Sequence, residues 1–97
     1  MARTVGDLPR VRPGRVWKLV PTDEGLEADS GLVRVHLRAP RRVGAVHALA
    51  DLVQAGTHTA ETLAMLVFYT CGQDEAVTRS DLDLLFGRGV LDEEPDR

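Results

Sequence analysis

Residues 31–38 of this chain read GLVRVHLR. Apolar and basic residues alternate through the stretch: Val33, Arg34, Val35, His36, Leu37 and Arg38. Successive side chains of a β-strand point to opposite faces of its sheet, so the alternation predicts a strand at 32–38 with one apolar and one basic face. The stretch also divides the chain, because the residues before it have strand and turn character and those after it have helical periodicity.

Two shorter strands are predicted before this one. Residues 15–20 (RVWKLV) are rich in residues that favour strands, and residues 26–29 (LEAD) are expected to pair back against them. Residues 21–25 (PTDEG) join the two with turn chemistry, since proline presets one backbone dihedral angle and glycine permits a positive one. Three closely spaced strands with tight turns predict an antiparallel meander.

Two helices are predicted after it. Apolar residues recur every three or four positions from Val43 onward, which is typical of a helix with one buried face, and Gly56 then ends the pattern. Thr57 or Thr59 is suited to cap a second helix at 60–70, which is apolar on nearly every side. In so small a protein such a helix is expected to be central or to be covered by a second subunit, so a homodimer through 60–70 is one prediction.

A third helix is predicted at about 80–88. Ser80 and Asp83 have the spacing of a capping box, in which each of the two side chains accepts a hydrogen bond from the backbone N–H of the other residue. Gly89 then has the position of a helix stop. Residues 71–78, before this helix, are expected to form a loop.

The predicted order of three strands followed by three helices is the layout of an α+β fold. It resembles a small winged-helix-like domain whose three-stranded antiparallel sheet comes first. We expect residues 1–14 to form an extended arm, residues 15–91 a single domain, and residues 92–97 (DEEPDR) a frayed acidic tail.

The sequence contains no pattern of an enzyme, a metal site or a membrane segment. Cys71 is the single cysteine, and the three histidines fall on separate predicted elements. Neither a phosphate-binding glycine loop nor a nucleophile motif is present. No apolar run approaches the roughly 18 residues that span a bilayer, and the first ten residues lack the apolar region of a signal peptide. We therefore expect a cytoplasmic binding protein without catalytic activity, cofactor or membrane partner.

The charge is unevenly distributed along the chain. Residues 1–42 carry nine Arg or Lys against five Asp or Glu, whereas residues 43–97 carry three against ten. This asymmetry predicts a basic surface that binds an acidic partner. A surface whose mixed charges serve only solubility would give the same pattern.

The predicted strand 32–38 is the last of the meander and is therefore an edge of the sheet. An edge leaves backbone N–H and C=O groups unpaired, so it can accept a guest strand from another chain. Arg34, His36 and Arg38 would favour a guest that carries Asp or Glu. Alternatively, these residues only form the solvent-exposed face of a sheet whose other face is covered, and their charge protects the edge from pairing with another chain.

Three stretches together resemble a known family. They are LPRVRPGRVWKL at 8–19, DLVQAGTHTAETLAML at 51–66 and SDLDLLFGRGVLDEE at 80–94. They are similar to the approach to the first strand, the junction of the first two helices and the closing helix of precursor-peptide recognition elements. These elements, of the PqqD type, serve pathways that make ribosomally synthesised and post-translationally modified peptides.

The resemblance implies that a leader peptide binds as an extra strand beside the third strand, with its apolar side chains between that strand and the third helix. The peptide-binding residues that it implies here are Val33, Arg34, Val35, His36, Leu37, Arg38, Asp81, Leu82, Leu84, Leu85 and Arg88. Leu84 stands out, because Leu82, Leu85 and Phe86 already supply the inward stripe of the helix, unless that stripe is broader. Since this chain carries no enzyme, it would present the peptide to a modifying enzyme that acts in trans.

Two other functions stay open. A winged-helix DNA-binding regulator would use arginines to meet phosphates: Arg10, Arg12, Arg15, Arg34, Arg38, Arg41 and Arg42. Its recognition helix at 80–88 would however carry Asp81 and Asp83 against Arg88, so nucleic acid is not expected as a partner. The other alternative is a docking or dimerisation domain of a larger assembly.

Overall fold

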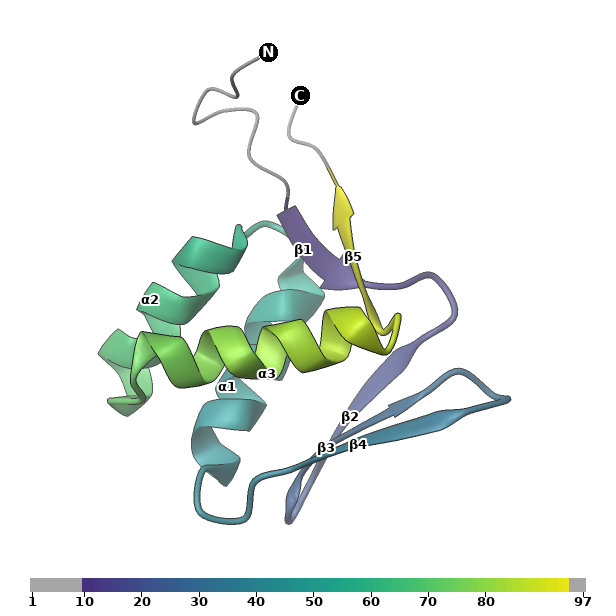
Figure 1. Cartoon of the computed structure of the whole chain (residues 1–97), viewed down its shortest axis with the longest axis horizontal. Helices are drawn as coiled ribbons and strands as arrows, with labels where there is room; N and C mark the ends of the chain where they lie inside the picture. Colours follow the sequence, from purple (N-terminus) through teal and green to yellow (C-terminus); the bar gives the residue numbers. More distant parts are fainter. Residues whose placement is uncertain (1–9, 95–97) are drawn as a thin grey trace.

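Four strands precede three helices, and a fifth strand follows the helices, in residues 10–94, the part of the chain that the computed structural model describes (Figure 1). The strands are β1 (Arg10–Pro13), β2 (Lys18–Thr22), β3 (Gly25–Asp29), β4 (Arg34–Arg38) and β5 (Leu91–Glu94). The helices are α1 (Val43–Ala55), α2 (Ala60–Cys71) and α3 (Glu75–Gly87).

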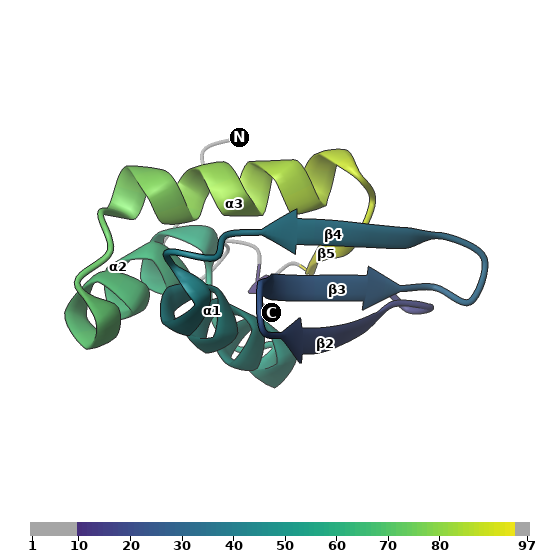
Figure 2. The same ribbon diagram turned by 90° about the horizontal axis from the view of Figure 1, so that it is seen from below.

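The predicted α+β fold is confirmed. The strands β2, β3 and β4 form an antiparallel sheet in that order, and three helices follow (Figure 2). The arrangement is compatible with a winged-helix-like domain. The register places Leu26 opposite Leu37 and Glu27 opposite His36, so apolar residues of β3 and β4 share one face and charged residues share the other.

The core lies between the apolar face of this sheet and the helices. Helix α1 contacts β1, β2, β3 and α2, while α3 packs on α2 and β5. The largest fully buried side chains come from strands, helices and the segment after α3: Leu49, Leu63, Leu82, Leu85, Val11, Val46, Val53, Val67, Val90 and Thr78. The small core is therefore aliphatic, as the low aromatic content requires.

A second sheet of two strands was not predicted. Strand β1 pairs antiparallel with β5, so the expectation of a frayed tail is wrong for residues 92–94, while residues 1–9 and 95–97 lie outside the described part. Val11 and Leu91 anchor the two strands in the core, and the register sets Arg12 opposite Asp92. Opposite charges directly across two strands favour their pairing.

Helix α3 begins earlier than predicted. It starts at Glu75, and Asp74 caps it by accepting a hydrogen bond from the backbone N–H of Ala76 at 2.8 Å. The predicted loop at 71–78 is therefore confirmed only for residues 72–74, and the predicted cap at Ser80 is wrong. Thr78, in this first turn, is fully buried.

The predicted helix ends are confirmed. Gly56 ends α1 and Gly89 follows α3, both with positive φ. The N–H of Val90 donates to the carbonyl of Leu85 and that of Gly89 to Phe86, which is the Schellman pattern of a glycine stop. Thr59 caps α2 by accepting from the N–H of Thr62.

Candidate functional site at the free edge of β4

Strand β4 lies at an edge of its sheet, on the side of α3 in Figure 2. Two hydrogen bonds show which of its backbone groups face β3. The N–H of Ser30 donates to the carbonyl of Val33 at 3.0 Å, and the N–H of Ala39 donates to the carbonyl of Glu24 at 2.7 Å. Val33 and Ala39, at the two ends of the strand, therefore direct their backbone groups toward β3.

The residues between these two ends alternate in direction. In an antiparallel ladder the backbone groups of successive residues point to opposite sides. The backbone N–H and C=O groups of Val35 and Leu37 thus point toward β3, like those of Val33 and Ala39. Arg34, His36 and Arg38 direct their N–H and C=O groups outward, where β4 has no partner strand within residues 10–94.

The opposite edge, at β2, presents fewer donors. Alternate residues of β3 face β2, where they pair with Lys18, Val20 and Thr22. The outward backbone groups of β2 then belong to Leu19 and Pro21. Because proline has no N–H, this edge offers a neighbour one donor only.

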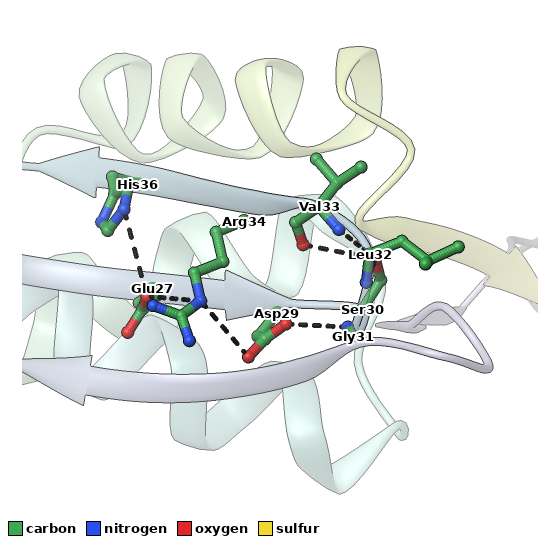
Figure 3. A network of polar contacts seen from close by, with 8 residues as sticks. All are labelled: Glu27, Asp29, Ser30, Gly31, Leu32, Val33, Arg34 and His36. Carbon is green, nitrogen blue, oxygen red and sulfur yellow. Dashed lines mark hydrogen bonds and ion pairs between the residues drawn. The ribbon is translucent and has the colours of Figure 1, made fainter.

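The solvent face of the sheet carries charges whose sign alternates from strand to strand. Arg34 Nε on β4 lies 3.6 Å from both the Oε1 of Glu27 and the Oδ2 of Asp29 on β3 (Figure 3). His36 Nε2 lies 4.0 Å from the same Glu27 oxygen. On β2, Lys18 stands opposite Asp29. The predicted basic face of β4 is therefore confirmed, and acids of β3 lie beside it.

These ion pairs leave the basic face accessible. Arg38 Nε lies 3.1 Å from Oε2 of Glu24, and the two side chains are 69% and 59% exposed. Exposed pairs of this kind contribute about 0–1 kcal/mol each to stability. All three of these arginine contacts are measured from Nε, whereas a guanidinium carries five N–H donors in all. The guanidinium groups of Arg34 and Arg38 are therefore exposed and have further N–H groups besides Nε.

The opposite face of β4 becomes more exposed toward its start. Leu37 is buried and Val35 is half-buried, but Val33 is 56% exposed and points toward α3 in Figure 3. On α3, Leu84 is 41% exposed, which confirms the expectation that it lies off the inward stripe. Val33 and Leu84 are therefore apolar side chains that a neighbouring chain could cover.

The turn before β4 is held by side chains. Asp29 Oδ1 accepts from the N–H of Gly31 at 2.8 Å, and Ser30 Oγ accepts from the N–H of Val33 at 3.1 Å (Figure 3). Gly31 has φ of +89°, a conformation that glycine adopts without strain. The turn leaves Leu32 96% exposed.

Asp81 was implied as a peptide contact, but in the structure it is buried and binds Arg42. Arg42 donates two hydrogen bonds to the two Asp81 oxygens, at 2.8 and 3.1 Å, and a third to Gln73 at 2.9 Å. The hydrogen bond with Asp81 raises the pKa of the Arg42 guanidinium, against the lowering effect of burial. Arg42 follows β4 closely in the chain, so the pair ties α3 to the end of β4. Sequence spacing gave no signal for it.

The other implied residues divide into buried and exposed ones. Leu82 and Leu85 are 2% exposed each, so they belong to the core beneath α3. Arg88 is exposed at the end of α3. Of the eleven implied residues, the structure therefore leaves Val33, Leu84 and the outward residues of β4 open to a partner, along with Arg88.

A second exposed apolar group lies on α2. Leu63, Ala64 and Val67 are buried, whereas Met65, Phe68 and Tyr69 are exposed; the last two rings meet edge to face at 5.6 Å. The helix is therefore not central, which was one of the two expectations for it.

A cavity of about 480 Å³ lies at the start of α1, lined among others by Arg41, Gly44 and Cys71. The Cys71 Sγ lies 3.5 Å from Thr70 Oγ1 and 3.9 Å from the carbonyl oxygen of Gly44. Neither neighbour is a base that would activate a thiol. In the described part of the chain no three His, Cys, Asp or Glu side chains are placed to hold a metal ion, and no helix is long and apolar enough to cross a membrane.

Comparison with known proteins adds no family. No protein-family model matches this chain, and a search of curated proteins found no match.

Proposed function

We propose that this protein is a peptide-binding module without catalytic activity. It takes an extended segment of a precursor leader peptide as an additional strand on β4 and presents that peptide to separate modifying enzymes. The observation that carries the proposal is the row of outward backbone groups at Arg34, His36 and Arg38, in a strand with no proline or bulge. Since such a precursor is made on cytoplasmic ribosomes, we also infer that the protein acts in the cytoplasm.

Main-chain pairing supplies part of the affinity. Each hydrogen bond between a guest strand and β4 replaces one to water, so its net contribution is about 1 kcal/mol. Three residues that each offer one donor and one acceptor can therefore support micromolar binding only with help from side chains. Burial of Val33 and Leu84 by the guest would supply the rest of the binding free energy, at about 25 cal/mol per Å² of apolar surface buried.

Helix α3 forms the second wall of the proposed site. The Arg42–Asp81 pair holds this helix to the chain just after β4, and Leu82 and Leu85 fix its inner face in the core. In the proposal, Leu82 and Leu85 support the wall while Leu84 contacts the guest. Asp81 positions the wall and makes no contact with the peptide.

The test is fluorescence polarisation with the labelled leader of the precursor peptide encoded nearest to this protein's gene. A scrambled leader and a DNA duplex serve as controls for sequence and charge. We expect saturable binding to the leader alone. Leu84→Glu should weaken it about tenfold, because a charge would be placed against the guest's apolar residue.

Met65→Glu is the matched control, since Met65 is 42% exposed against 41% for Leu84 but lies on α2. Equal affinities of the Leu84 and Met65 variants would remove Leu84 from the site. Absence of any leader binding, together with salt-sensitive binding of the duplex, would replace the proposal with DNA binding.

A docking or dimerisation role is the second candidate, and the exposed side chains of Met65, Phe68 and Tyr69 favour it. Aromatic residues and methionine are enriched in protein interfaces. Sedimentation equilibrium of the full chain tests this role, and a monomer at all concentrations would argue against the homodimer. The two roles use different surfaces, so one does not exclude the other.

A further inference from the structure

We infer that the charges of β4 select its guest: the edge admits an extended peptide with Asp or Glu at every second residue and rejects the β4 strand of a second copy. The inference rests on the proposed function for the place of binding. It adds the chemical class of strand that this place accepts.

The direction of the backbone groups sets which guest residues meet the charges. In an antiparallel ladder, two residues directly opposite each other either both bond across the pair or both point away. A guest that bonds Arg34, His36 and Arg38 must therefore set its own bonding residues directly opposite these three. Opposite residues share a face with Cβ atoms about 5 Å apart, so guest residues i, i+2 and i+4 meet the basic side chains.

Shifting the guest along the edge does not change this requirement. The register can move only in steps that keep bonding residues opposite bonding residues, so the same alternate set of guest residues always meets the same basic set. Acidic residues at these positions would continue the sign alternation of the face, from Lys18 on β2 to Asp29 on β3 and Arg34 on β4. The intervening guest residues would lie on the side of Val33.

The same geometry rejects a second copy. Two β4 strands that pair antiparallel through their free edges must set members of the outward set opposite one another. A register centred on His36 puts Arg34 of each copy opposite Arg38 of the other, and other registers also oppose basic residues. Like charges directly opposite destabilise a pair of strands. A regular edge with Leu32 and Val33 exposed would otherwise invite such pairing.

The experiment uses three labelled synthetic peptides, Gly-Xaa-Leu-Xaa-Val-Xaa-Leu-Gly, in which Xaa is Glu, Gln or Lys. They are titrated with the full chain by fluorescence polarisation at low and at high salt. We expect the Glu peptide to bind about tenfold tighter than the Gln peptide and the Lys peptide to bind least. The difference should shrink at high salt, because the charges are exposed.

Two double variants complete the test. Arg34→Gln with Arg38→Gln should remove the preference for Glu, whereas Arg41→Gln with Arg79→Gln lowers the net charge equally outside β4 and should keep it. Equal binding of all three peptides, or a preference that survives in the first variant, would overturn the inference and leave strand addition standing. Failure of these peptides and of the leader alike would instead overturn the proposed function.

Self-association gives a separate readout. In sedimentation equilibrium the Arg34→Gln, Arg38→Gln variant should gain an associated species that the parent and the Arg41, Arg79 variant lack. If all three proteins sediment alike, the charges do not keep copies apart and that half of the inference is wrong.

Discussion

The two edges of the β2-β3-β4 sheet differ in what they offer to a neighbouring strand. Strand β2 directs Leu19 and Pro21 outward, so its edge lacks a donor at one of two positions. Strand β4 directs three outward residues with complete backbone groups, each carrying a basic side chain. The β2 edge thus lacks one main-chain donor, whereas the β4 edge has all of its donors and carries basic side chains.

The surroundings of the two edges differ as well. Helix α1 packs on β2, and His47 Nε2 lies 2.7 Å from the carbonyl oxygen of Thr22 at the end of that strand. Beside β4 the support comes from the Arg42–Asp81 pair, which holds α3 in place. The comparison teaches that the two edges of one sheet can differ both in their main-chain donors and in the elements that support them, and the proposed binding site is at the edge with the complete backbone.

The largest expected effect comes from breaking the wall beside β4. Asp81→Ala leaves Arg42 partly buried without its carboxylate, and should cost about 2 kcal/mol of stability, or about 10 °C in melting temperature. Thermal unfolding followed by circular dichroism measures it. Asp83→Ala, an exposed change in the same helix, should stay within about 0.5 kcal/mol of the parent. Similar melting temperatures for both variants would show that the pair does not hold α3.

A smaller effect is expected when the β4 edge is made to resemble the β2 edge. The N–H of His36 points away from β3, so His36→Pro removes a donor from the edge without removing a bond of the sheet. Leader affinity should fall about tenfold while stability changes little.

His36→Ala is the control for the proline variant, because it removes the imidazole and keeps the N–H. It should lose less than about threefold in affinity. If the proline and alanine variants bind the leader equally well, main-chain pairing at this position is not part of recognition.

The smallest effect is expected from opening the β2 edge. Pro21→Val restores a donor, whose hydrogen bond to a neighbouring strand would contribute about 1 kcal/mol. Weak self-association should then be detected, at the highest protein concentrations only, by sedimentation velocity. Thr22→Val changes the neighbouring residue without adding a donor and should behave as the parent does. Self-association of the Thr22 variant alone would mean that hydrophobicity, and not the donor, controls this edge.

Local patterns in the sequence predicted most of the fold. The alternation around Val35 predicted the edge strand, and the glycines at 56 and 89 marked the ends of two helices. What local patterns missed depends on distant partners. The strand at Leu91 needs β1 opposite it, and the first turn of α3 is stabilised by burial of Thr78 in a core built from the whole chain.

The candidate site was predicted less completely. The exposure of Leu84 and the charge of β4 follow from periodicity within one element. The family resemblance implied that Asp81 contacts the peptide, whereas in the structure Asp81 binds Arg42, 39 positions away in the chain. No spacing rule connects two such residues, and their pairing becomes visible only when α3 and the end of β4 are placed together.

The pairing of β1 with β5 has a consequence for how this unit can be joined to others. The register sets Arg10 opposite Glu94, so the described chain enters and leaves the fold at one point. A domain whose ends meet can be inserted into a surface loop of a host protein, or be circularly permuted, with short connections and little strain on its core. Strand β4 belongs to the other sheet, so a graft made at this point would leave the open edge unattached.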